Sequence, residues 1–246
     1  MSSITVRDNP ENDTVEIRFS DEPTDGPSEP YIRSYNNTRD NAFGPLDAFD
    51  CEYIFRQTSR AGPELHRLGS ILWCHAYLQL CPKSCYVLEN QYGTAVGYII
   101  GTSDTSVMAH VMRTDLVDML SDRFTQVKTD DPPEVVALKG SIVTGDCSML
   151  LRKPDLLAQY PAHLHINLLP EYRKKGWGAK LMKVFLEKVK RLGARGVHLG
   201  MHAENTNAKR FYERLGFRQC EEELDGGLSG EMGRIRNAIC MLKKLD

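Results

Sequence analysis

The strongest constraint on the fold of this sequence is a contiguous pattern of strand, basic turn and helix between residues 163 and 192. The segment HLHINLL is apolar and of strand length, RKKGWG is a basic turn with two glycines, and the residues after it have helical periodicity. The first amides of a helix have no intrahelical acceptor, and glycine lets a phosphate approach the backbone. Residues 173–178 are therefore predicted to bind a phosphate group, with a solvated helix start as the alternative. The apolar stripe of the helix consists of Met182, Phe185, Leu186, Val189 and Leu192.

The rest of the sequence alternates between strand and helix patterns. A strand is expected from Tyr31, helices over about 40–58 and 64–80, and a hairpin that turns around residues 90–93. A helix over 177–192, a strand over 197–202, a short helix up to Leu215 and strands near 217–222 and 235–242 follow. This mixture predicts an α/β or α+β sandwich around a central sheet.

Two segments depart from this alternation. Residues 1–29 are polar and are interpreted as an arm, with one short strand over 14–19 that pairs with the main domain or with a second copy in a homodimer. Residues 106–160 are interpreted as a helical insertion, with a turn near Pro132 and a helix opened by Asp146 or Ser148. The sequence therefore predicts a single domain over 30–246 that follows the arm.

The overall charge argues against several classes of partner. The 31 basic and 33 acidic residues leave a formal charge of -2, which gives no broad attraction for nucleic acid or anionic lipid. No stretch approaches the roughly 20 apolar residues that a bilayer requires, and the N-terminus lacks the order of a signal peptide. We expect a cytoplasmic protein without a nucleic-acid or membrane partner.

The seven cysteines are odd in number and scattered, which is typical of reduced, structural thiols. Cys74, His75, Cys81 and Cys85 form the only cluster that suggests a metal site. Their intervals match no standard zinc pattern, and a second paired half is missing. We therefore expect core packing and no metal.

The basic turn belongs to a longer segment, LLPEYRKKGWGAKLM, which resembles motif A of the GNAT acetyltransferases. In that motif an Arg or Gln precedes two variable residues, Gly, a variable residue, and Gly or Ala. The resemblance implies a GNAT fold: a mixed, mostly antiparallel sheet flanked by helices, with splayed central strands that bind acetyl-CoA. It also implies strand contacts to the pantetheine arm from Ile166, Leu168 and Leu169, and pyrophosphate contacts from Arg173, Lys174, Lys175, Gly176, Trp177 and Gly178.

A second segment, ENTNAKRFYERLGF, resembles motif B of the same family. Its pattern predicts a short helix that ends in a left-handed cap at Gly216, before a strand that begins at Phe217. The resemblance implies that residues of this helix complete the cofactor site, with Asn205 hydrogen-bonded to the cofactor arm. The cofactor contacts implied here are Asn205, Ala208, Phe211 and Tyr212.

Three further segments, PYIRSYN, SCYVLENQYGTAVGYIIGT and YPAHLHINLLP, are similar to the acetyltransferase-like domain attached to some O-GlcNAc hydrolases. Kinship with that subgroup does not by itself imply turnover. In that subgroup an Asp often occupies the strand position that is Asn167 here, so this chain lacks one candidate base. A catalytically silent, CoA-binding regulatory or interaction domain is therefore an alternative to an enzyme.

Acyl transfer from a thioester to an amine requires a proton acceptor, oxyanion stabilisation and a proton for the departing thiolate. Tyr212 matches the family's general acid, with simple aromatic packing as the alternative. His165 and His202 are the preferred bases, because imidazole titrates near neutrality. Asn167, His163 and Glu204 are candidate substrate contacts, and ideal alternation places His163, His165 and Asn167 on one strand face. For His198 and His202, an exposed polar face is the alternative.

The acceptor is expected to be selected by the early helices and by the segment 106–160. No marked acidic groove is evident in the sequence, so nothing favours a polybasic tail. A small primary amine is the first hypothesis, and a protein lysine or N-terminus is the second.

Overall fold

The computed structural model describes residues 3–9, 14–20, 29–36, 47–59, 62–222, 224 and 238–245. Within them, seven strands form one sheet in the order β3-β4-β5-β6-β7-β9-β8. All neighbouring strands are antiparallel except β6 and β7, which are parallel. The predicted mixed, mostly antiparallel sheet is thus confirmed. Its strands are β3 (Tyr31–Ser34), β4 (Tyr86–Glu89), β5 (Ala95–Thr102), β6 (Ala162–Leu168), β7 (Gly196–His202), β8 (Arg218–Gln219) and β9 (Ala238–Lys244).

The N-terminal segment contains two strands where the sequence predicted one. β1 (Ser3–Asn9) and β2 (Thr14–Ser20) pair with each other in an antiparallel register. β2 is the predicted strand, and within the chain it pairs with β1 and not with the seven-stranded sheet. β1 was missed because its alternation rests on only two apolar residues, Ile4 and Val6.

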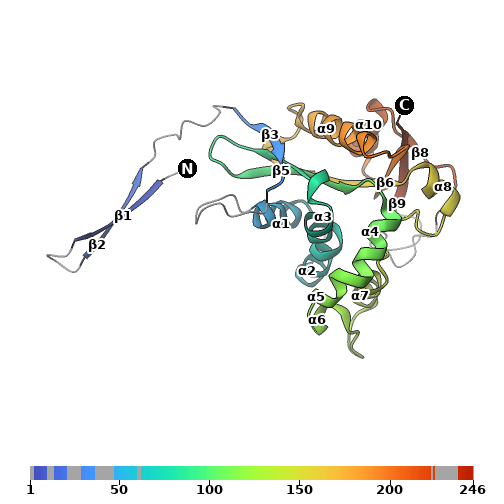
Figure 1. The fold of residues 1–246 in the computed structure, drawn as a ribbon, viewed down its shortest axis with the longest axis horizontal. Helices are drawn as coiled ribbons and strands as arrows, with labels where there is room; N and C mark the ends of the chain where they lie inside the picture. Colours follow the sequence, from blue (N-terminus) through green and yellow to red (C-terminus); the bar gives the residue numbers. More distant parts are fainter. Residues whose placement is uncertain are drawn as a thin grey trace.

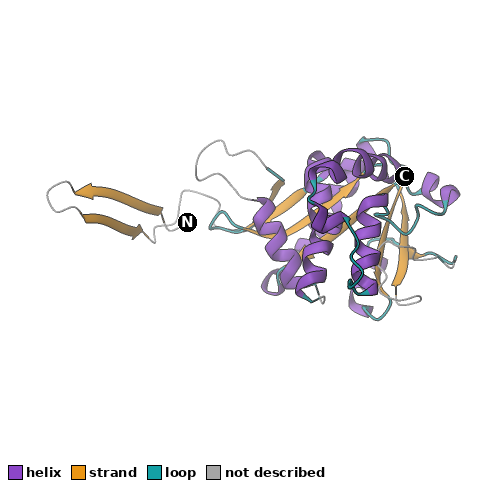
Figure 2. Ribbon diagram, turned by 90° about the horizontal axis from the view of Figure 1, so that it is seen from below, coloured by secondary structure: helices purple, strands orange, loops and turns teal. Residues whose placement is uncertain are grey.

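Helices cover both faces of the seven-stranded sheet (Figure 1). One face carries α9 (Trp177–Arg191) and α10 (Thr206–Arg214). Figure 2 views the molecule from below Figure 1, toward the face of the sheet on which other helices lie. The helices on this side, long and short, are α1 (Asp47–Thr58), α2 (Pro63–Ser70), α3 (Ala76–Leu80), α4 (Thr105–Val111), α5 (Val117–Met119), α6 (Asp122–Thr125) and α7 (Pro133–Thr144).

Two helices differ in their bounds or continuity from the predicted ones. The helix expected over 40–58 is α1, which begins at Asp47, and residues 37–46 lie outside the described part. The helix expected over 64–80 is α2 and α3 joined by a π-helical turn, Ile71–His75, and it ends at Leu80 before Pro82. Such π turns occur often at functional sites.

The core on the α9 side is built on the predicted apolar stripe, with one correction. Met182, Phe185 and Val189 are fully buried together with Leu181, and Leu186 packs against them. Leu192, predicted as the last member of the stripe, is 52% exposed, because the helix ends at Arg191 and the backbone then turns away. A second hydrophobic core lies between the other face of the sheet and helices α1, α3 and α4.

The segment 106–160 is helical, as expected, but no helix begins at Asp146 or Ser148. α7 starts at Pro133, directly after the predicted turn, and ends at Gly145 in a left-handed conformation. The Gly145 and Asp146 amides donate to the carbonyls of Ile142 and Ser141, which closes the helix in the Schellman manner. The next helix, α8 (Pro154–Gln159), starts only at Pro154.

Candidate cofactor and acyl-transfer site

The two parallel strands β6 and β7 form a fork. They pair only at Ala162↔Val197 and His163↔His198, although both strands continue for several residues. β6 stays paired with β5 as far as Leu168, so its edge toward β7 is open beyond His163. Splayed central strands, predicted from the family resemblance, are therefore present.

The open edge of β6 exposes main-chain groups of alternate residues. The Leu169 amide donates to the Val96 carbonyl at 3.0 Å, which commits Leu169 to β5. In an antiparallel ladder the direction of the peptide groups alternates along the strand, so those of Ile166 and Leu168 point away from β5. These two residues offer backbone hydrogen bonds within the fork, whereas the Leu169 amide does not.

The loop after β6 presents a run of unused amides. The backbone N–H groups of residues 174–179 have no hydrogen-bond acceptor among the described residues, and Lys180 is the first whose amide bonds back, to the Gly176 carbonyl at 3.2 Å. Gly176 has φ 84° as the N-cap of α9, and Lys174 has φ 59°, which is unusual for a residue with a side chain. Left-handed backbone at the start of a helix, together with the helix dipole, is a geometry that favours an anion.

The second glycine of the loop, Gly178, packs closely against α10. A Cβ atom on Gly178 would lie 3.2 Å from Cζ of Phe211. The first turn of α9 therefore touches α10, and the two sequence motifs form one structural unit. Trp177, between the glycines, is covered by the Lys180 ammonium at 4.0 Å from the ring centroid.

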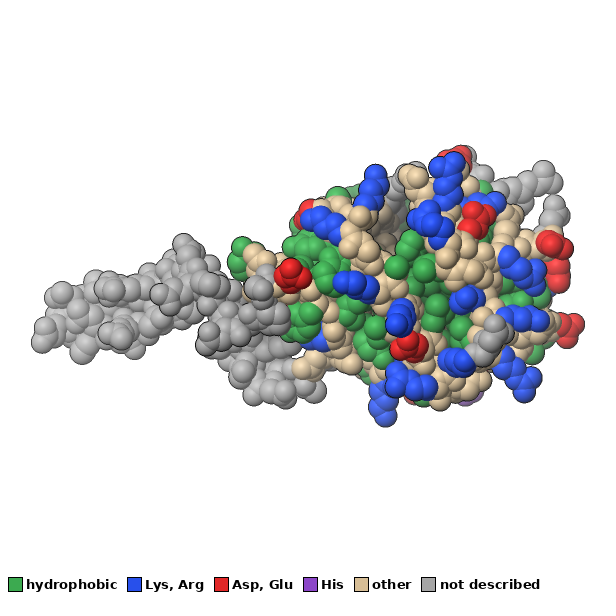
Figure 3. Space-filling model, turned by 90° about the horizontal axis from the view of Figure 1, so that it is seen from above, with side chains coloured by type: hydrophobic (Ala, Val, Ile, Leu, Met, Phe, Trp, Pro, Cys, Tyr) green, Lys and Arg blue, Asp and Glu red, His purple; other side chains and the backbone are tan. Residues whose placement is uncertain are grey.

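Positive charge gathers around this loop. Residues 171–191 contain eight basic and two acidic side chains, in a chain whose formal charge is -2. Figure 3 shows the face that α9 and α10 cover, on which Lys and Arg predominate. Arg173, Lys174 and Lys175 are exposed, and Arg173 Nε donates to the Leu168 carbonyl at 2.8 Å. Arg173 thus ties the end of β6 to the loop, and the local field favours an anion.

α10 brings the motif B residues to the same side. The Asn205 side chain accepts a hydrogen bond from the Ala208 amide at 3.1 Å and caps the helix. Ala208 and Phe211 are partly buried, and Tyr212 is 9% exposed between Phe211 and Phe217. Burial raises the pKa of Tyr212 above its ordinary value, so that the phenol stays protonated at neutral pH.

The predicted shared face of β6 is present, but its residues differ in exposure. Asn167 Nδ2 donates to the Tyr98 hydroxyl at 2.7 Å, and His165 Nε2 lies 3.1 Å from the Tyr77 hydroxyl. Both side chains are partly buried. His163 is 2% exposed, and its two ring nitrogens bond Tyr77 and Thr105. His163 therefore lies behind Tyr77 and does not contact a substrate directly in this arrangement.

On β7, the two histidines have opposite environments. His198 is 2% exposed, with Nδ1 2.7 Å from the Tyr160 carbonyl and Nε2 bonded to Ser148, so an exposed face is wrong for His198. His202 and Glu204 are exposed at the far end of the strand. Burial, above all, lowers the pKa values of His165 and His198 to about 4 and that of His163 well below its usual range. All three rings are neutral at pH 7.

The partners of the buried histidines were not among the predicted residues. Tyr77, Thr105 and Ser148 lie 50 to 88 residues from the imidazoles that they contact. They stand in segments that carry no motif, and no local pattern in the sequence indicates them. The nearest signal was the alternation of histidines on β6 and β7.

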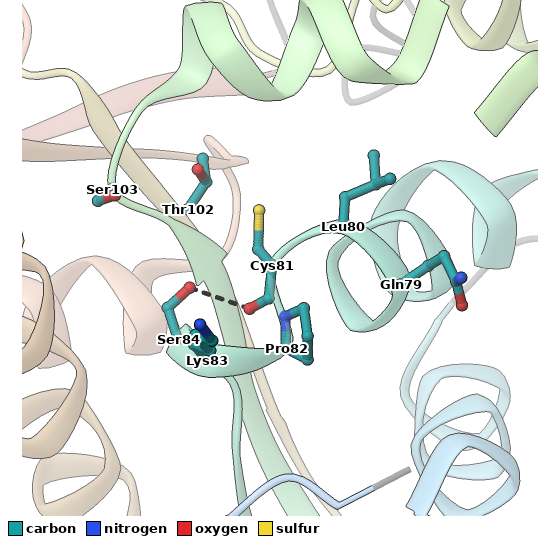
Figure 4. Close-up of a pocket in the computed structure, with 8 residues that line it drawn as sticks. All are labelled: Gln79, Leu80, Cys81, Pro82, Lys83, Ser84, Thr102 and Ser103. Atoms are coloured by element: carbon teal, nitrogen blue, oxygen red, sulfur yellow. Dashed lines mark hydrogen bonds between the residues drawn. The ribbon is translucent and has the colours of Figure 1, made fainter. Parts of the chain in front are cut away.

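The cysteine-containing cluster has no metal-site geometry. Among the described residues, no group of three or more His, Cys, Asp or Glu side chains is arranged to hold a metal ion, and no two of the seven cysteines are joined in a disulfide. A cavity of about 430 Å³ near Cys81, Ser84 and Thr102 lies at the opposite end of β5 from Leu168 (Figure 4). Burial raises the pKa of the Cys81 thiol, which disfavours the thiolate form of a nucleophile. None of the helices in the described ranges is long and apolar enough to span a bilayer.

Comparison with known proteins matches the part of the chain that holds both the loop and α10. Residues 51–217 match the model of the Acetyltransferase (GNAT) family. The chain is similar to the crystal structure of SsHAT, with 27% identity and a TM-score of 0.68, over 89% of this chain and 99% of that one. It also aligns with Ard1 from Thermoplasma volcanium (18% identity, TM-score 0.47, 89% and 99% coverage). A further alignment is with yncA from Salmonella typhimurium, solved with acetyl-CoA (14% identity, TM-score 0.46, 89% and 95% coverage).

Proposed function

Because this chain belongs to the acetyltransferase (GNAT) family, we propose that it transfers the acetyl group of acetyl-CoA to a primary amine, first of all that of a small molecule. One observation carries the proposal. A run of backbone amides without acceptors, residues 174–179, lies at the mouth of a fork between β6 and β7. An anionic pyrophosphate satisfies such a loop, and an extended pantetheine arm satisfies the open edge of β6.

The cofactor contacts follow from this arrangement. The amides of Lys174 to Gly178 hold the pyrophosphate, with Arg173 adding charge. The peptide groups of Ile166 and Leu168 bind the arm as an extra strand would, and the Leu168 amide is the candidate donor to the thioester carbonyl. Asn205 retains its side-chain amide nitrogen for the cofactor, since its oxygen caps α10. When bound, acetyl-CoA supplies the acetyl group as a thioester, from which the amine displaces the thiolate.

Two proton transfers accompany this displacement, one from the ammonium of the acceptor and one to the thiolate. Tyr212 is the proposed acid, because it is protonated and lies on α10 beside Phe211, which touches the start of α9. His165 is the preferred base over His202 because it stands on the open part of β6, whereas His202 is exposed at the end of β7. Asn167, fixed by Tyr98, and Glu204 remain candidate contacts for the acceptor.

The test is a screen of purified protein with acetyl-CoA against small primary amines, lysine-containing peptides and peptides with free N-termini, with thiol release as the readout. Release with small amines supports the proposal. Release with peptides alone replaces it with a protein acetyltransferase. Tight binding of CoA in calorimetry without release on any amine would indicate a silent CoA-binding domain. Failure to bind CoA at millimolar concentration would overturn the site itself.

A further inference from the structure

A series of hydrogen bonds leads from His165 into the interior of the protein. His165 Nε2 lies 3.1 Å from the Tyr77 hydroxyl, which bonds Nε2 of His163. On the other side of the His163 ring, Nδ1 lies 2.6 Å from the Thr105 hydroxyl, which is also 2.6 Å from the Pro161 carbonyl oxygen. We call these five groups the Tyr77 series. They come from β6 and the residue before it, from α3 and from the start of α4.

The direction of every proton in the Tyr77 series is fixed by its last member. The Pro161 carbonyl only accepts, so the Thr105 hydroxyl donates to it and must accept from His163 Nδ1–H. His163 is neutral because burial keeps its pKa low, so Nε2 carries the lone pair and accepts from the Tyr77 hydroxyl. The oxygen of Tyr77 then accepts from His165 Nε2–H. For a neutral His165, the remaining lone pair is on Nδ1.

The tautomer of His198, on the neighbouring strand β7, is fixed in the same way by a different carbonyl. His198 Nδ1 lies 2.7 Å from the Tyr160 carbonyl, which also only accepts, so Nδ1 is protonated and Nε2 accepts from Ser148. The His163 and His198 rings are 5.3 Å apart at the last paired position of the fork. Two consecutive carbonyls, Tyr160 and Pro161, therefore set the tautomers of two facing imidazoles.

We propose that Tyr77 is a positioning residue for the acyl transfer, which holds His165 in the Nε2–H tautomer and so keeps the basic lone pair of this ring on Nδ1. This inference rests on the proposed function, because His165 is the base there. Tyr77 is fully buried and stands two residues after the π-helical turn that interrupts its helix. A π turn shifts the residues that follow it around the helix axis, which aims the Tyr77 side chain at β6. Tyr77 contacts both β6 imidazoles, with ring centroids 5.3 Å from His163 and 5.0 Å from His165.

The direct test measures the tautomers in the wild-type protein. Long-range proton–nitrogen correlation spectra of protein labelled with ¹⁵N-histidine at pH 7.5 distinguish Nε2–H from Nδ1–H rings. We expect Nε2–H for His165 and Nδ1–H for His163 and His198, with assignments from single His→Gln variants. An Nδ1–H tautomer at His165 overturns the proposal without any reference to activity.

The variant Tyr77→Phe tests whether Tyr77 is the cause. We expect His165 to become a mixture of tautomers and kcat to fall by about ten- to a hundredfold, with the KM for acetyl-CoA within about twofold of wild type. Tyr160→Phe is the matched control, since it removes another buried hydroxyl, one that accepts from Arg218. An unchanged His165 tautomer together with an unchanged kcat in Tyr77→Phe refutes the assignment.

A second pair of variants covers the case in which Tyr77→Phe does not fold. Thr105→Val removes the hydroxyl that fixes His163, whereas Thr105→Ser keeps it. We expect Thr105→Val to alter the tautomers of both His163 and His165, and Thr105→Ser to restore them. Equal spectra for the two variants contradict the series. If the wild type releases no thiol with any amine, the proposed function fails, while the tautomer spectra still decide whether Tyr77 sets His165.

Discussion

The two faces of the sheet contribute to the candidate site in different ways. On the face of α9 and α10, the site is mostly main chain: amides of one loop, the open edge of β6, and glycines that let groups approach, to which α10 adds the side chains of Asn205 and Tyr212. On the opposite face it is side chain: histidines of β6 and β7 held by Tyr77, Thr105 and Ser148. A main-chain site depends on a short contiguous sequence, whereas the side-chain arrangement exists only after α3, α4 and β6 have packed together.

The largest expected effect is a loss of stability in acid, which arises from the buried histidines on the side-chain face. The pKa of His198 falls to about 4 on folding, from about 6.5 in the unfolded chain, because the ring is buried. Between these two pH values the unfolded state binds a proton that the folded state does not. The contribution of this histidine to the free energy of unfolding is therefore fully present above pH 6.5 and is lost as the pH falls from there through 4. We expect a loss on the order of 3 kcal/mol from this group. Urea unfolding at pH 7.5 and 4.5 measures it.

Carboxylates also titrate near pH 4, so the acid experiment needs a comparison that isolates the imidazole. His198→Gln retains a donor for the Tyr160 carbonyl and an acceptor for Ser148, and it does not titrate. Its stability should depend less steeply on pH than that of the wild type. Parallel pH curves for the two proteins would show that the buried imidazole is not responsible.

Tyr212→Phe tests the proposed acid on the α9 and α10 face. Loss of the proposed general acid should lower kcat about a hundredfold, while CoA binding stays within about twofold, because the ring and its packing remain. Steady-state kinetics measures kcat, and calorimetry measures the affinity for CoA. Turnover equal to wild type at every pH would leave Tyr212 with packing alone.

Gly176→Ala sharpens the main-chain side of the comparison, and Gly193→Ala is its matched control. Both glycines flank α9 with positive φ, 84° and 91°, and neither has an atom within 4 Å of an added Cβ. Each variant should lose about 1–2 kcal/mol of stability from backbone strain. Only Gly176→Ala should weaken CoA binding, by about tenfold, since it alone reshapes the amide run. Equal CoA affinities in calorimetry would contradict a pyrophosphate site at this loop.

Asn205→Ala should have the smallest effect. Removing the cap of α10 costs about 1 kcal/mol of stability, which thermal unfolding detects as a modest drop in Tm. A role limited to capping predicts little change in CoA affinity once the protein is folded. A drop in affinity that exceeds the stability loss would favour the direct cofactor contact.

The sequence was informative where the physics is local. The loop 173–178 and α10 each follow from contiguous residues, and the shared face of His163, His165 and Asn167 follows from strand alternation. The environments of those side chains could not be predicted in this way. Nothing near Tyr77 indicates that its hydroxyl bonds a histidine 86 residues away, and the exposed face proposed for His198 ignored α8 and Ser148.

The helix wrongly expected at Asp146 or Ser148 has the same cause. Both residues are good N-caps in isolation. In the fold, the Ser148 hydroxyl donates to His198 and the Asp146 carboxylate pairs with Arg152 at 3.5 Å. Gly145 ends the preceding helix just before them. The two side chains that were expected to cap a helix are therefore engaged by other residues of the fold.

The contact between Gly178 and Phe211 has a consequence for exchanging parts among homologues. Because the missing Cβ at 178 makes room for the ring at 211, a bulkier residue at one position calls for a smaller one at the other. A loop grafted from a relative should therefore function only when its companion helix is transplanted with it, and paired substitutions such as Gly178→Ala with Phe211→Leu should tolerate each other better than the first does alone.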